Sequence, residues 1–343
     1  MEEETLNIQT PIVFDESIAH CETHAHQPYA SSTFNNSDEV RITVQNQDLC
    51  LLPSKISLHV YGNLVTEDGS TATESTIMVN NAICHLFEEI RYEMNAIEID
   101  RNKDVGLTSF MKGYVSLSPS QRSLMKNAGW RDVREREKLT NADGYFDVSI
   151  PLNLILGFAE YYRKIVVNAK HELLLTRAKS DVNAIVKTAA EQCKVVIHKL
   201  EWLIPYVKVS DRRKIQLLRF VERDAPISVS FCTWELCKYP LLPTTSKHVS
   251  TVKTSIQLEK PRYVILGYQT NRKNKKNKNA SHFNHCNVRD VKLFLNSQCY
   301  PYGNLNLDID YNQFALLYEM YANFQAAYYG KNPEPLLKKA EFL

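Results

Sequence analysis

The chain has 343 residues, of which 44% are hydrophobic and 23% charged, and its formal net charge is +2. This length exceeds the roughly 250 to 300 residues at which one hydrophobic core stops growing, so we expect two domains. The near-neutral charge excludes a strong field over the whole molecule that would draw it to nucleic acid or acidic membranes, so any electrostatic function must be local.

The cysteines are scattered and form no Cys-x-x-Cys pair, which is typical of reduced thiols rather than of a disulfide framework; they are Cys21, Cys50, Cys84, Cys193, Cys232, Cys237, Cys286 and Cys299. No apolar run approaches the roughly 18 residues of a membrane span. The acidic start MEEE lacks the basic-then-apolar order of a signal peptide. We therefore expect synthesis in the cytoplasm or nucleus and no membrane span.

The first stretch of the chain is polar and irregular, with Asn, Ser and Thr clustered in SSTFNNSDE. This composition predicts an N-terminal arm over residues 1–45 without a core of its own. Strand patterns begin with RITVQ at the end of this range. They continue in KISLHVYGN, where Ile56, Leu58 and Val60 alternate with polar residues.

The stretch VNNAICHLFEEIRYEMN, residues 79–95, begins with one structural period and ends with another. Apolar residues at i, i+3, i+4 and i+7 from Ile83 to Ile90 predict a helical turn behind two asparagines that can cap it. From Ile90 onward, Tyr92 and Met94 alternate with charged and polar residues, which predicts a strand. A capped helical turn is therefore expected to lead directly into a sheet.

The middle of the chain predicts one small helix and then strands. SPSQRSLMKNAGW has Ser118 as N-cap, Pro119 at the first position, Gln121 to close a capping box and Gly129 after the end. Strands are predicted in YFDVSIP, IVVNAKHELLLTRA and KVVIHKLEWLIPYVKV. In the last of these, the residues expected on a common face are Val196, Leu200, Trp202 and Ile204.

A helical pattern in SDRRKIQLLRFVERD, behind a Ser210 cap, marks the predicted domain junction. Strand patterns return in ISVSF, RYVILGY and VKLFL, interrupted by the basic loop NRKNKKNKN. DYNQFALLYEMYANFQAAYY predicts a helix with Asp310 and Gln313 as a capping box and an apolar side made of Phe314, Leu317, Tyr318, Tyr321 and Phe324. We expect an all-β chain of sandwiches, with one domain over residues 46–209 and a linking helix and second domain over residues 210–343.

Two histidine-rich stretches have the residue types of a zinc site. They are HCETHAH, with His20, Cys21, His24 and His26, and HFNHC, with His282, His285 and Cys286. Their spacings match none of the paired patterns of structural zinc sites, so solvent-exposed histidines are favoured. NRKNKKNKN has five cations that could meet phosphates, but asparagines rather than aromatic residues separate them, so a solvated hairpin loop is favoured.

Other chemical candidates are explained by structure. Asp308 and Asp310 could form a carboxylate pair, although a helix cap accounts for Asp310. His85, His171 and His198 lie in periodic segments, where a packed histidine is more common than a catalytic base. The sequence has no phosphate-binding glycine loop, GxSxG or HExxH motif. We therefore predict no catalytic, cofactor-binding or metal-binding residues.

An ordered series of segments resembles the double jelly-roll major capsid protein of Polinton (Maverick) elements, adintoviruses and virophages. The segments are residues 80–95, AGWRD (128–132), IPLNLILGF (150–158), HELLLTRAKSD (171–181), VVIHKLEWLIPYVKVSD (195–211), KYPLLPTTSK (238–247), RYVILGYQ (262–269) and VKLFLNSQCYP (291–301). Each segment is short, and the resemblance rests on their shared order.

The resemblance implies two consecutive antiparallel jelly rolls side by side, with short helices in their loops. The helical turn before Ile90 would lie in such a loop, with Leu86 and Phe87 closing the mouth of the first sandwich. The family usually runs on past the equivalent of ALLYEMYANF, whereas this chain stops at Leu343, so we expect an incomplete second roll. Asn95-Ala96 stands where the family often has Asn-Gly, so we expect a remodelled turn there.

The resemblance also implies a function. The first hypothesis is a major capsid subunit of a virion, which forms homotrimers of pseudo-hexagonal outline that tile an icosahedral shell. Its partners would be further copies of itself and a minor capsid or penton protein, with nucleic-acid contact only local. The alternative is a domesticated host-genome copy of the fold that acts as a protein-interaction module. A third hypothesis is a metal-dependent β-sandwich enzyme that uses the histidine-rich stretches.

Overall fold

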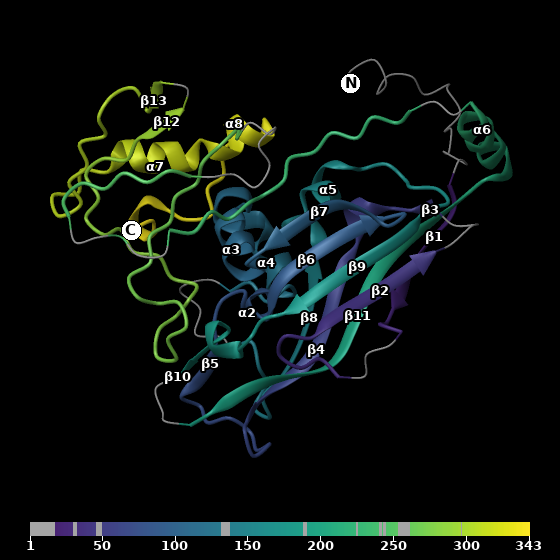
Figure 1. The fold of residues 1–343 in the computed structure, drawn as a ribbon, viewed down its shortest axis with the longest axis horizontal. Coiled ribbons are helices and arrows are strands. Elements are labelled where there is room, and N and C mark those ends of the chain that lie inside the picture. Colours follow the sequence, from purple (N-terminus) through teal and green to yellow (C-terminus); the bar gives the residue numbers. More distant parts are fainter. Residues whose placement is uncertain are drawn as a thin grey trace, which may run out of the picture.

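The structure is a computed structural model that describes residues 18–29, 33–45, 50–131, 138–187, 191–223, 226–239, 242, 245–252, 261–295 and 297–343. In these residues two antiparallel sheets pack face to face, and a region of loops and helices lies beside them (Figure 1). None of the helices described is long and apolar enough to cross a lipid bilayer.

The first sheet has the strand order β1-β11-β4-β8, and each neighbouring pair is antiparallel. Its strands are β1 (Ile18–His26), β11 (Cys193–Val209), β4 (Ser57–Thr66) and β8 (Tyr145–Pro151), and the short β3 (Cys50–Leu51) also pairs with β11. The central strands of this sheet show the alternation of buried and outward side chains that the sequence predicts. Leu58 and Val60 of β4 and Phe146 and Val148 of β8 point into the core.

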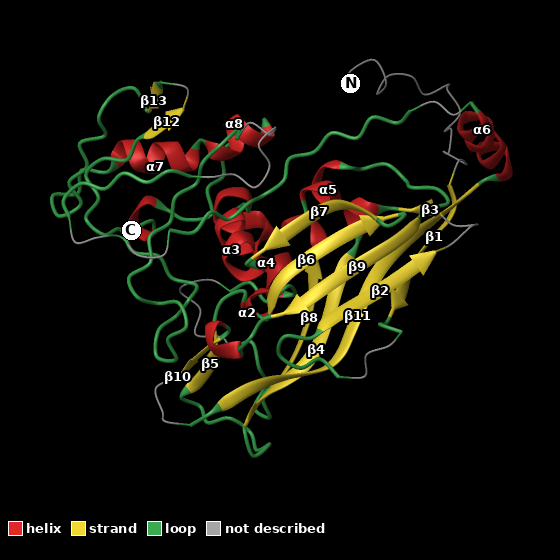
Figure 2. Cartoon of the chain, in the orientation of Figure 1, coloured by secondary structure: helices red, strands yellow, loops and turns green. Residues whose placement is uncertain are grey.

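The second sheet has the order β2-β9-β6-β7, again antiparallel throughout. Its strands are β2 (Glu39–Gln45), β9 (Lys170–Arg177), β6 (Phe87–Met94) and β7 (Ile97–Lys103). If the short strands are set aside, the chain crosses from one sheet to the other at every connection except the β6–β7 hairpin (Figure 2). Eight strands in two sheets joined in this way form a jelly roll.

The core of this sandwich lies between the two inner faces. Trp202 of β11 and Tyr92 of β6 are both fully buried, and their rings meet edge to face at 6.1 Å. Ile42 of β2 and Leu175 of β9 belong to the same sheet as Tyr92 and are buried in the same core. Burial of each such side chain contributes about 1.5 to 3 kcal/mol, so the sandwich can be stable by its own packing.

Short elements fill the connections. They are η1 (Pro53–Lys55), β5 (Thr76–Met78), α2 (Ala82–His85), α3 (Val105–Ser116), η2 (Pro119–Gln121), α4 (Arg122–Lys126), η3 (Leu152–Leu154), α5 (Gly157–Tyr161), η4 (Asp181–Asn183) and β10 (Ile185–Lys187), the last paired with β5. The predicted capping box of Ser118 and Gln121 is present at the small helix. Figure 1 shows α3 and α4 between the sandwich and the later part of the chain.

The predicted transition from helical turn to strand in residues 79–95 is confirmed. Helix α2 ends at His85, and β6 begins at Phe87. Leu86 and Phe87 are buried in the sandwich core, as expected for residues that close its mouth. Asn81 precedes α2 with a φ of 58°, but its side chain donates to Ser109 Oγ at 2.8 Å instead of capping the helix.

The turn between β6 and β7 keeps positive φ at both central residues, with 51° at Asn95 and 63° at Ala96. The expected remodelling therefore does not occur, because the hairpin holds the alanine in the left-handed region. The left-handed conformation costs an L-residue about 1 to 2 kcal/mol, and a glycine avoids most of that cost. We expect Ala96→Gly to raise the free energy of unfolding by about 1 kcal/mol, measured by urea denaturation.

A matched variant places the same change in a helix. Ala326→Gly alters an exposed residue of α8 (Phe324–Tyr329) and is expected to lower stability by about 1 kcal/mol, because glycine is a poor helix former. A loss of stability in both variants would show that Ala96 is unstrained.

The prediction of a coreless arm over residues 1–45 is wrong in its described part. Residues 18–26 form the edge strand β1, and β2 places Val40, Ile42 and Val44 in the core. The arm thus supplies two of the eight strands. The pattern of β1 was not recognisable because most of its residues are exposed on both faces, so no apolar alternation is needed. Residues 1–17 lie outside the described part.

The predicted common face of β11 is also partly wrong. Val196 is only half-buried, whereas Val195 and Ile197 are buried. The pairing with β4 shifts register between Ile197 and Lys199, so one extra residue reverses the inward parity. After this bulge, Leu200, Trp202 and Ile204 face the core as predicted.

We call the part of the chain beyond Val209 the second region. Its described elements are α6 (Asp211–Glu222), β12 (Leu293–Leu295), β13 (Gln298–Tyr300), α7 (Ala315–Ala322), α8 and η5 (Lys339–Glu341). The predicted linking helix is confirmed as α6, and VKLFL forms β12 in part. The strands predicted in residues 227–231 and 262–268 are absent, because no described strand pairs with them. The stretch KYPLLPTTSK lies partly outside the described residues.

The last helix begins later than predicted. Its first residue is Ala315, while Asp308 pairs with Gln313 in an isolated bridge and accepts a hydrogen bond from the Tyr311 N–H at 3.3 Å. The predicted capping box of Asp310 and Gln313 is therefore replaced by this turn. Phe314 and Phe324 are buried, as the apolar stripe predicted.

Candidate functional site

A buried ion pair beside the sandwich also receives a hydrogen bond from the second region. Lys112 of α3 is 1% exposed, and its Nζ lies 2.8 Å from Glu160 Oε2 of α5. The same ammonium donates to the Asn153 carbonyl oxygen at 2.8 Å, and burial lowers its pKa. Tyr329 of α8 donates its hydroxyl to Glu160 Oε1 at 2.8 Å. One carboxylate thus joins helices from both parts of the chain.

Residues 226–239, the crossing segment, run extended from the side of α6 across the top of the sandwich toward the last helices of the second region (Figure 1). Phe231 meets the Phe158 ring of α5 edge to face at 5.6 Å, and the Lys112 ammonium lies 5.4 Å from the Trp234 ring centre. Trp234 also contacts Tyr328 of α8 at 5.9 Å. The crossing segment is therefore held at its middle by aromatic contacts with both parts of the chain.

Gly157, the first residue of α5, lets the crossing segment approach this closely. A Cβ built on Gly157 would overlap the carbonyl oxygen of Cys232, which is backbone and cannot rotate away. We expect Gly157→Ala to lower the free energy of unfolding by about 1 to 3 kcal/mol, as overpacking does. Thermal or urea denaturation would measure the loss.

Gly303→Ala is the matched control, because nothing lies within 4 Å of a Cβ at Gly303. Its effect should stay within about 0.5 kcal/mol. Alanine is otherwise the better helix former in α5, so unchanged or increased stability of Gly157→Ala would show that the crossing segment does not lie against this helix.

A second attachment comes from the end of the basic loop. Ser281 is 1% exposed, and its hydroxyl donates to the Asn80 carbonyl oxygen at 2.7 Å. His85 Nε2 lies 3.1 Å from the same hydroxyl. The Lys276 carbonyl oxygen accepts from the Lys187 N–H at 2.9 Å. The loop that was predicted as a solvated hairpin thus packs against the sandwich at these points, while most of its cations remain exposed.

The second region carries most of the large apolar side chains that are exposed in the described residues. Three segments of it, which we call the apolar segments, are 227–229, 249–252 and 264–266. Their exposed members are Ile227, Val229, Val249, Val252, Val264 and Leu266, with exposed fractions of 41% to 73%. Within the described residues, no backbone hydrogen bond is recorded for these segments. Exposed apolar groups with unpaired backbone are typical of surfaces that bind another chain.

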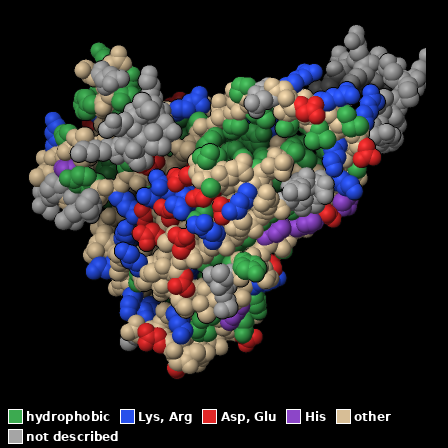
Figure 3. Space-filling model, turned by 45° about the vertical axis from the view of Figure 1, so that its right-hand side comes forward, with side chains coloured by type: hydrophobic (Ala, Val, Ile, Leu, Met, Phe, Trp, Pro, Cys, Tyr) green, Lys and Arg blue, Asp and Glu red, His purple; other side chains and the backbone are tan. Residues whose placement is uncertain are grey.

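The sandwich itself has a different surface. Ion pairs cover the outer face of the β2-β9-β6-β7 sheet, among them Arg91 with Glu93 at 3.0 Å and Lys170 with Glu172 at 3.3 Å. Figure 3 shows a face of the molecule with a mixed band of cationic and anionic side chains and hydrophobic side chains gathered above it. A mixed charged face is well solvated, so the apolar segments are the better candidates for an interface.

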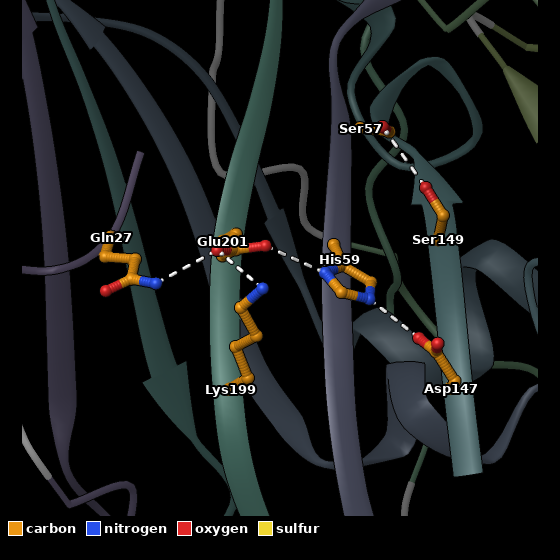
Figure 4. A network of polar contacts seen from close by, with 7 residues as sticks. All are labelled: Gln27, Ser57, His59, Asp147, Ser149, Lys199 and Glu201. Carbon is orange, nitrogen blue, oxygen red and sulfur yellow. Dashed lines mark hydrogen bonds and ion pairs between the residues drawn. The ribbon is translucent and has the colours of Figure 1, made fainter. Parts of the chain in front are cut away.

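The outer face of the other sheet carries a polar network (Figure 4). Glu201 of β11 accepts from Gln27 Nε2 at 3.0 Å, and its other oxygen lies 3.0 Å from His59 Nδ1 of β4. His59 Nε2 lies 2.7 Å from Asp147 Oδ1 of β8. Burial alone would raise the pKa of Glu201, but hydrogen bonds from Gln27, His59 and Lys199 outweigh it and lower that pKa to about 2.

This network does not have the arrangement of a hydrolase. Both ring nitrogens of His59 face carboxylates, so neither is left to take a proton from a serine. The hydroxyls of Ser57 and Ser149 lie 3.3 Å from each other, and Figure 4 marks no bond between either of them and the imidazole. The network instead links the outer faces of three neighbouring strands. It was missed in the sequence because only strand order brings these residues together.

The first histidine-rich stretch is β1. His20 and His24 flank Glu22 on one face, with nitrogen-to-oxygen distances of 3.3 and 2.7 Å, while Cys21 points to the other face. His26 Nε2 lies 3.2 Å from the Tyr206 hydroxyl. Among the described residues, no group of three metal-ligating side chains could hold an ion.

The other histidines and the cysteine considered as metal ligands or catalytic groups do not form a common site among the described residues. His282 is exposed, although partial desolvation by its neighbours lowers its pKa. His285 Nδ1 accepts from the Asn287 N–H at 3.2 Å, and Cys286 Sγ lies 3.8 Å from Thr270 Oγ1. His171 is buried, and its Nδ1 lies 2.6 Å from the Tyr92 hydroxyl. His198 is exposed on β11 beside Asn63. These positions are those of packed or surface histidines.

Comparison with known proteins points to one family. A family model described as "Double jelly roll-like domain" matches residues 76–343. Similar solved chains include the Faustovirus major capsid protein (10% identity, 64% of this chain and 59% of that chain, TM-score 0.41). Others are a chain of the Sputnik virophage solved by cryo-EM (9%, 60% and 51%, 0.42) and the mavirus major capsid protein (11%, 60% and 49%, 0.36).

The chain spans about half the length of the solved chains that it matches. No curated protein sequence matches it.

Proposed function

We propose that this chain, which belongs to the double jelly roll-like domain family, is a structural subunit of the major capsid type that works by self-association. The observation that carries the proposal is the contrast between the two parts of the chain. The sandwich buries its apolar residues in its own core, whereas the second region leaves the apolar segments exposed. A surface of this kind gains free energy when neighbouring subunits cover it, at roughly 25 cal/mol for each Å² buried.

The geometry suits assembly for a second reason. The edge strand β1 is exposed on both faces, and the backbone of the apolar segments is not paired with any described strand. Extended segments with alternating apolar residues add to sheet edges of other chains by backbone hydrogen bonds, and side chains then set specificity. Neighbouring copies would thus complete backbone hydrogen bonding that the described part of the chain leaves open.

The finer points of the proposal follow the family. Residues 46–209 would belong to the first roll, together with β1 and β2, and residues 210–343 to the linking helix and second roll. Three copies would form a capsomer of pseudo-hexagonal outline, and capsomers would tile an icosahedral shell with a minor capsid or penton protein. The chain would be a virion component, with an origin of the Polinton, adintovirus or virophage type. No catalytic step is assigned to it.

Self-association should depend on the apolar segments. We expect the purified chain to form trimers or larger regular assemblies, and the double variant Ile227→Ser, Val264→Ser to shift the mass distribution toward monomer at equal concentration. Light scattering coupled to size-exclusion chromatography would measure both. The variant should fold normally, because both side chains are about half exposed, at 58% and 46%.

Leu124→Ser is the matched control. It removes an apolar side chain of similar exposure, 73%, from α4 of the first roll. It should leave the mass distribution unchanged. A monomeric wild-type chain at high concentration, or an equal shift in Leu124→Ser, would contradict the proposed role of the apolar segments.

A further inference from the structure

The linking helix α6 has an amphipathic composition and lies almost wholly on the surface. All of its residues are exposed except Leu217, which is half-buried. Ile215, Leu218 and Val221 recur every three residues and so form one stripe, with exposed fractions of 50% to 58%. Buried helices of a globular protein turn such a stripe toward the core, whereas α6 turns no residue into one.

The helix carries a local excess of positive charge. Residues 210–223 contain five cations and two carboxylates, a local charge of +3 in a chain whose total is +2, so all other residues together carry −1. The cations are Arg212, Arg213, Lys214, Arg219 and Arg223. Arg212 and Arg219 lie seven residues apart, which places them on one flank of the apolar stripe.

The position of α6 leaves its surface accessible. It follows the end of β11 and projects at a corner of the molecule, beyond the ends of β1 and β3 (Figure 1). Ile18 of β1, which is 54% exposed, pairs with Val209 just before the helix, and Lys208 beside it is also exposed. A flat surface could thus meet the helix and this corner without meeting the sandwich face.

We propose that α6 binds the surface of an anionic lipid membrane, lying in the plane of the headgroups with Ile215, Leu218 and Val221 inserted. A basic helix with an apolar stripe matches this surface in both respects, because the cations meet the lipid charges while the stripe enters the acyl boundary. The proposal does not depend on self-association, since each helix carries the complete surface.

Other occupants fit less well. Nucleic acid would meet the cations but would leave the aliphatic stripe in water, and the helix has only Phe220 as a stacking ring. A second copy would need an apolar groove of helix width. A cavity beside Trp130 and another beside Tyr206 have volumes of about 10 Å³ each, which is room for about one water molecule and not for a leucine side chain.

The test is flotation of the full chain with vesicles of phosphatidylcholine alone and with vesicles that also contain phosphatidylserine. We expect binding only to the second kind, and weaker binding at high salt. The variant Arg212→Gln, Arg213→Gln, Arg219→Gln should bind about a hundredfold more weakly, because each cation near such a surface contributes about a fivefold factor. The variant Leu218→Ser, Val221→Ser should lose binding by tenfold or more.

The matched charge control is Lys273→Gln, Lys275→Gln, Lys278→Gln, which removes three cations from the basic loop. It should keep vesicle binding within about twofold. Equal losses in the two charge variants would overturn the proposal, because general attraction would then explain the binding. It would also be overturned if the α6 variants weakened binding to DNA or self-association while vesicle binding was absent.

A depth measurement separates insertion from simple electrostatic attachment. Leu218→Trp should show a blue shift of its fluorescence with phosphatidylserine vesicles, while Leu124→Trp, at an exposed residue of α4, should show none. Circular dichroism would check that both variants keep the native fold. An unshifted spectrum of Leu218→Trp in bound protein would contradict insertion of the stripe.

Discussion

Lys112→Met is expected to lower the free energy of unfolding by about 3 to 5 kcal/mol, because it leaves the Glu160 carboxylate without its buried cation. Glu160 is only 17% exposed at its side chain, and the ammonium lies 2.8 Å from it. The variant also removes the cation beside Trp234 and the donor to the Asn153 carbonyl oxygen. Urea denaturation followed by tryptophan fluorescence would measure the change.

The double variant Lys112→Met, Glu160→Gln is the informative control. It removes both charges and keeps an amide that can accept from the Tyr329 hydroxyl, so it should recover a large part of the lost stability. If Lys112→Met unfolds at the same urea concentration as the native chain, the ion pair does not hold the second region to the sandwich.

Acid is expected to destabilise the fold through two buried histidines. Burial lowers the pKa of His85 and of His171 to about 4, from an ordinary value of 6.5. As the pH falls from 6.5 to about 4, the unfolded chain takes up protons at these residues and the folded chain does not. Stability is therefore complete above about pH 6.5 and is lost as the pH falls, by about 3 kcal/mol for each histidine near pH 4.

Other groups act on the same pH range, so variants are needed to isolate the histidines. Burial raises the pKa of Asp100 to about 6, and this carboxyl therefore adds stability as the pH falls through that value. His171→Asn keeps an acceptor for the Tyr92 hydroxyl but cannot titrate. Between pH 6.5 and 4, the stability of this variant should fall less steeply than that of the native chain. The two slopes should differ by about 1.4 kcal/mol per pH unit.

The pH series therefore has a clear contrary outcome. Urea denaturation of the two proteins at several pH values would give parallel curves if His171 takes up its proton in the folded state as readily as in the unfolded state. The same comparison applies to His85→Gln, whose amide N–H can donate to the Ser281 hydroxyl oxygen. If each variant is less stable than the native chain by the same amount at every pH, including pH 7, the loss comes from altered packing and not from protonation.

Much of the first sandwich could be predicted from the sequence because its strands have one buried and one solvated face. Alternation located the first part of β4, all of β8 and the end of β6. A helical period followed by a strand period located the transition into β6, although the strand begins at Phe87 and not at the predicted Ile90. Capping residues located the small helix after Ser118. Each of these signals is local in the chain.

Other features depend on contacts between distant residues and left no local signal. The bulge after Ile197 reverses which residues of β11 face inward, and β1 has exposed residues on both faces. His59, Asp147 and Glu201 meet only because β8, β4 and β11 are neighbours in one sheet. Strand propensity in residues 262–268 was misleading, because propensity forms a strand only where a partner strand is present.

The central claim is that copies of this chain assemble through surfaces that the single chain leaves uncovered. Its most direct test is electron microscopy of the purified full chain at the highest concentration at which it stays dispersed. The account predicts class averages of trimers with a pseudo-hexagonal outline, or sheets and shells built from them. Uniform particles of the mass of one chain, with the apolar segments still accessible to proteases, would contradict it.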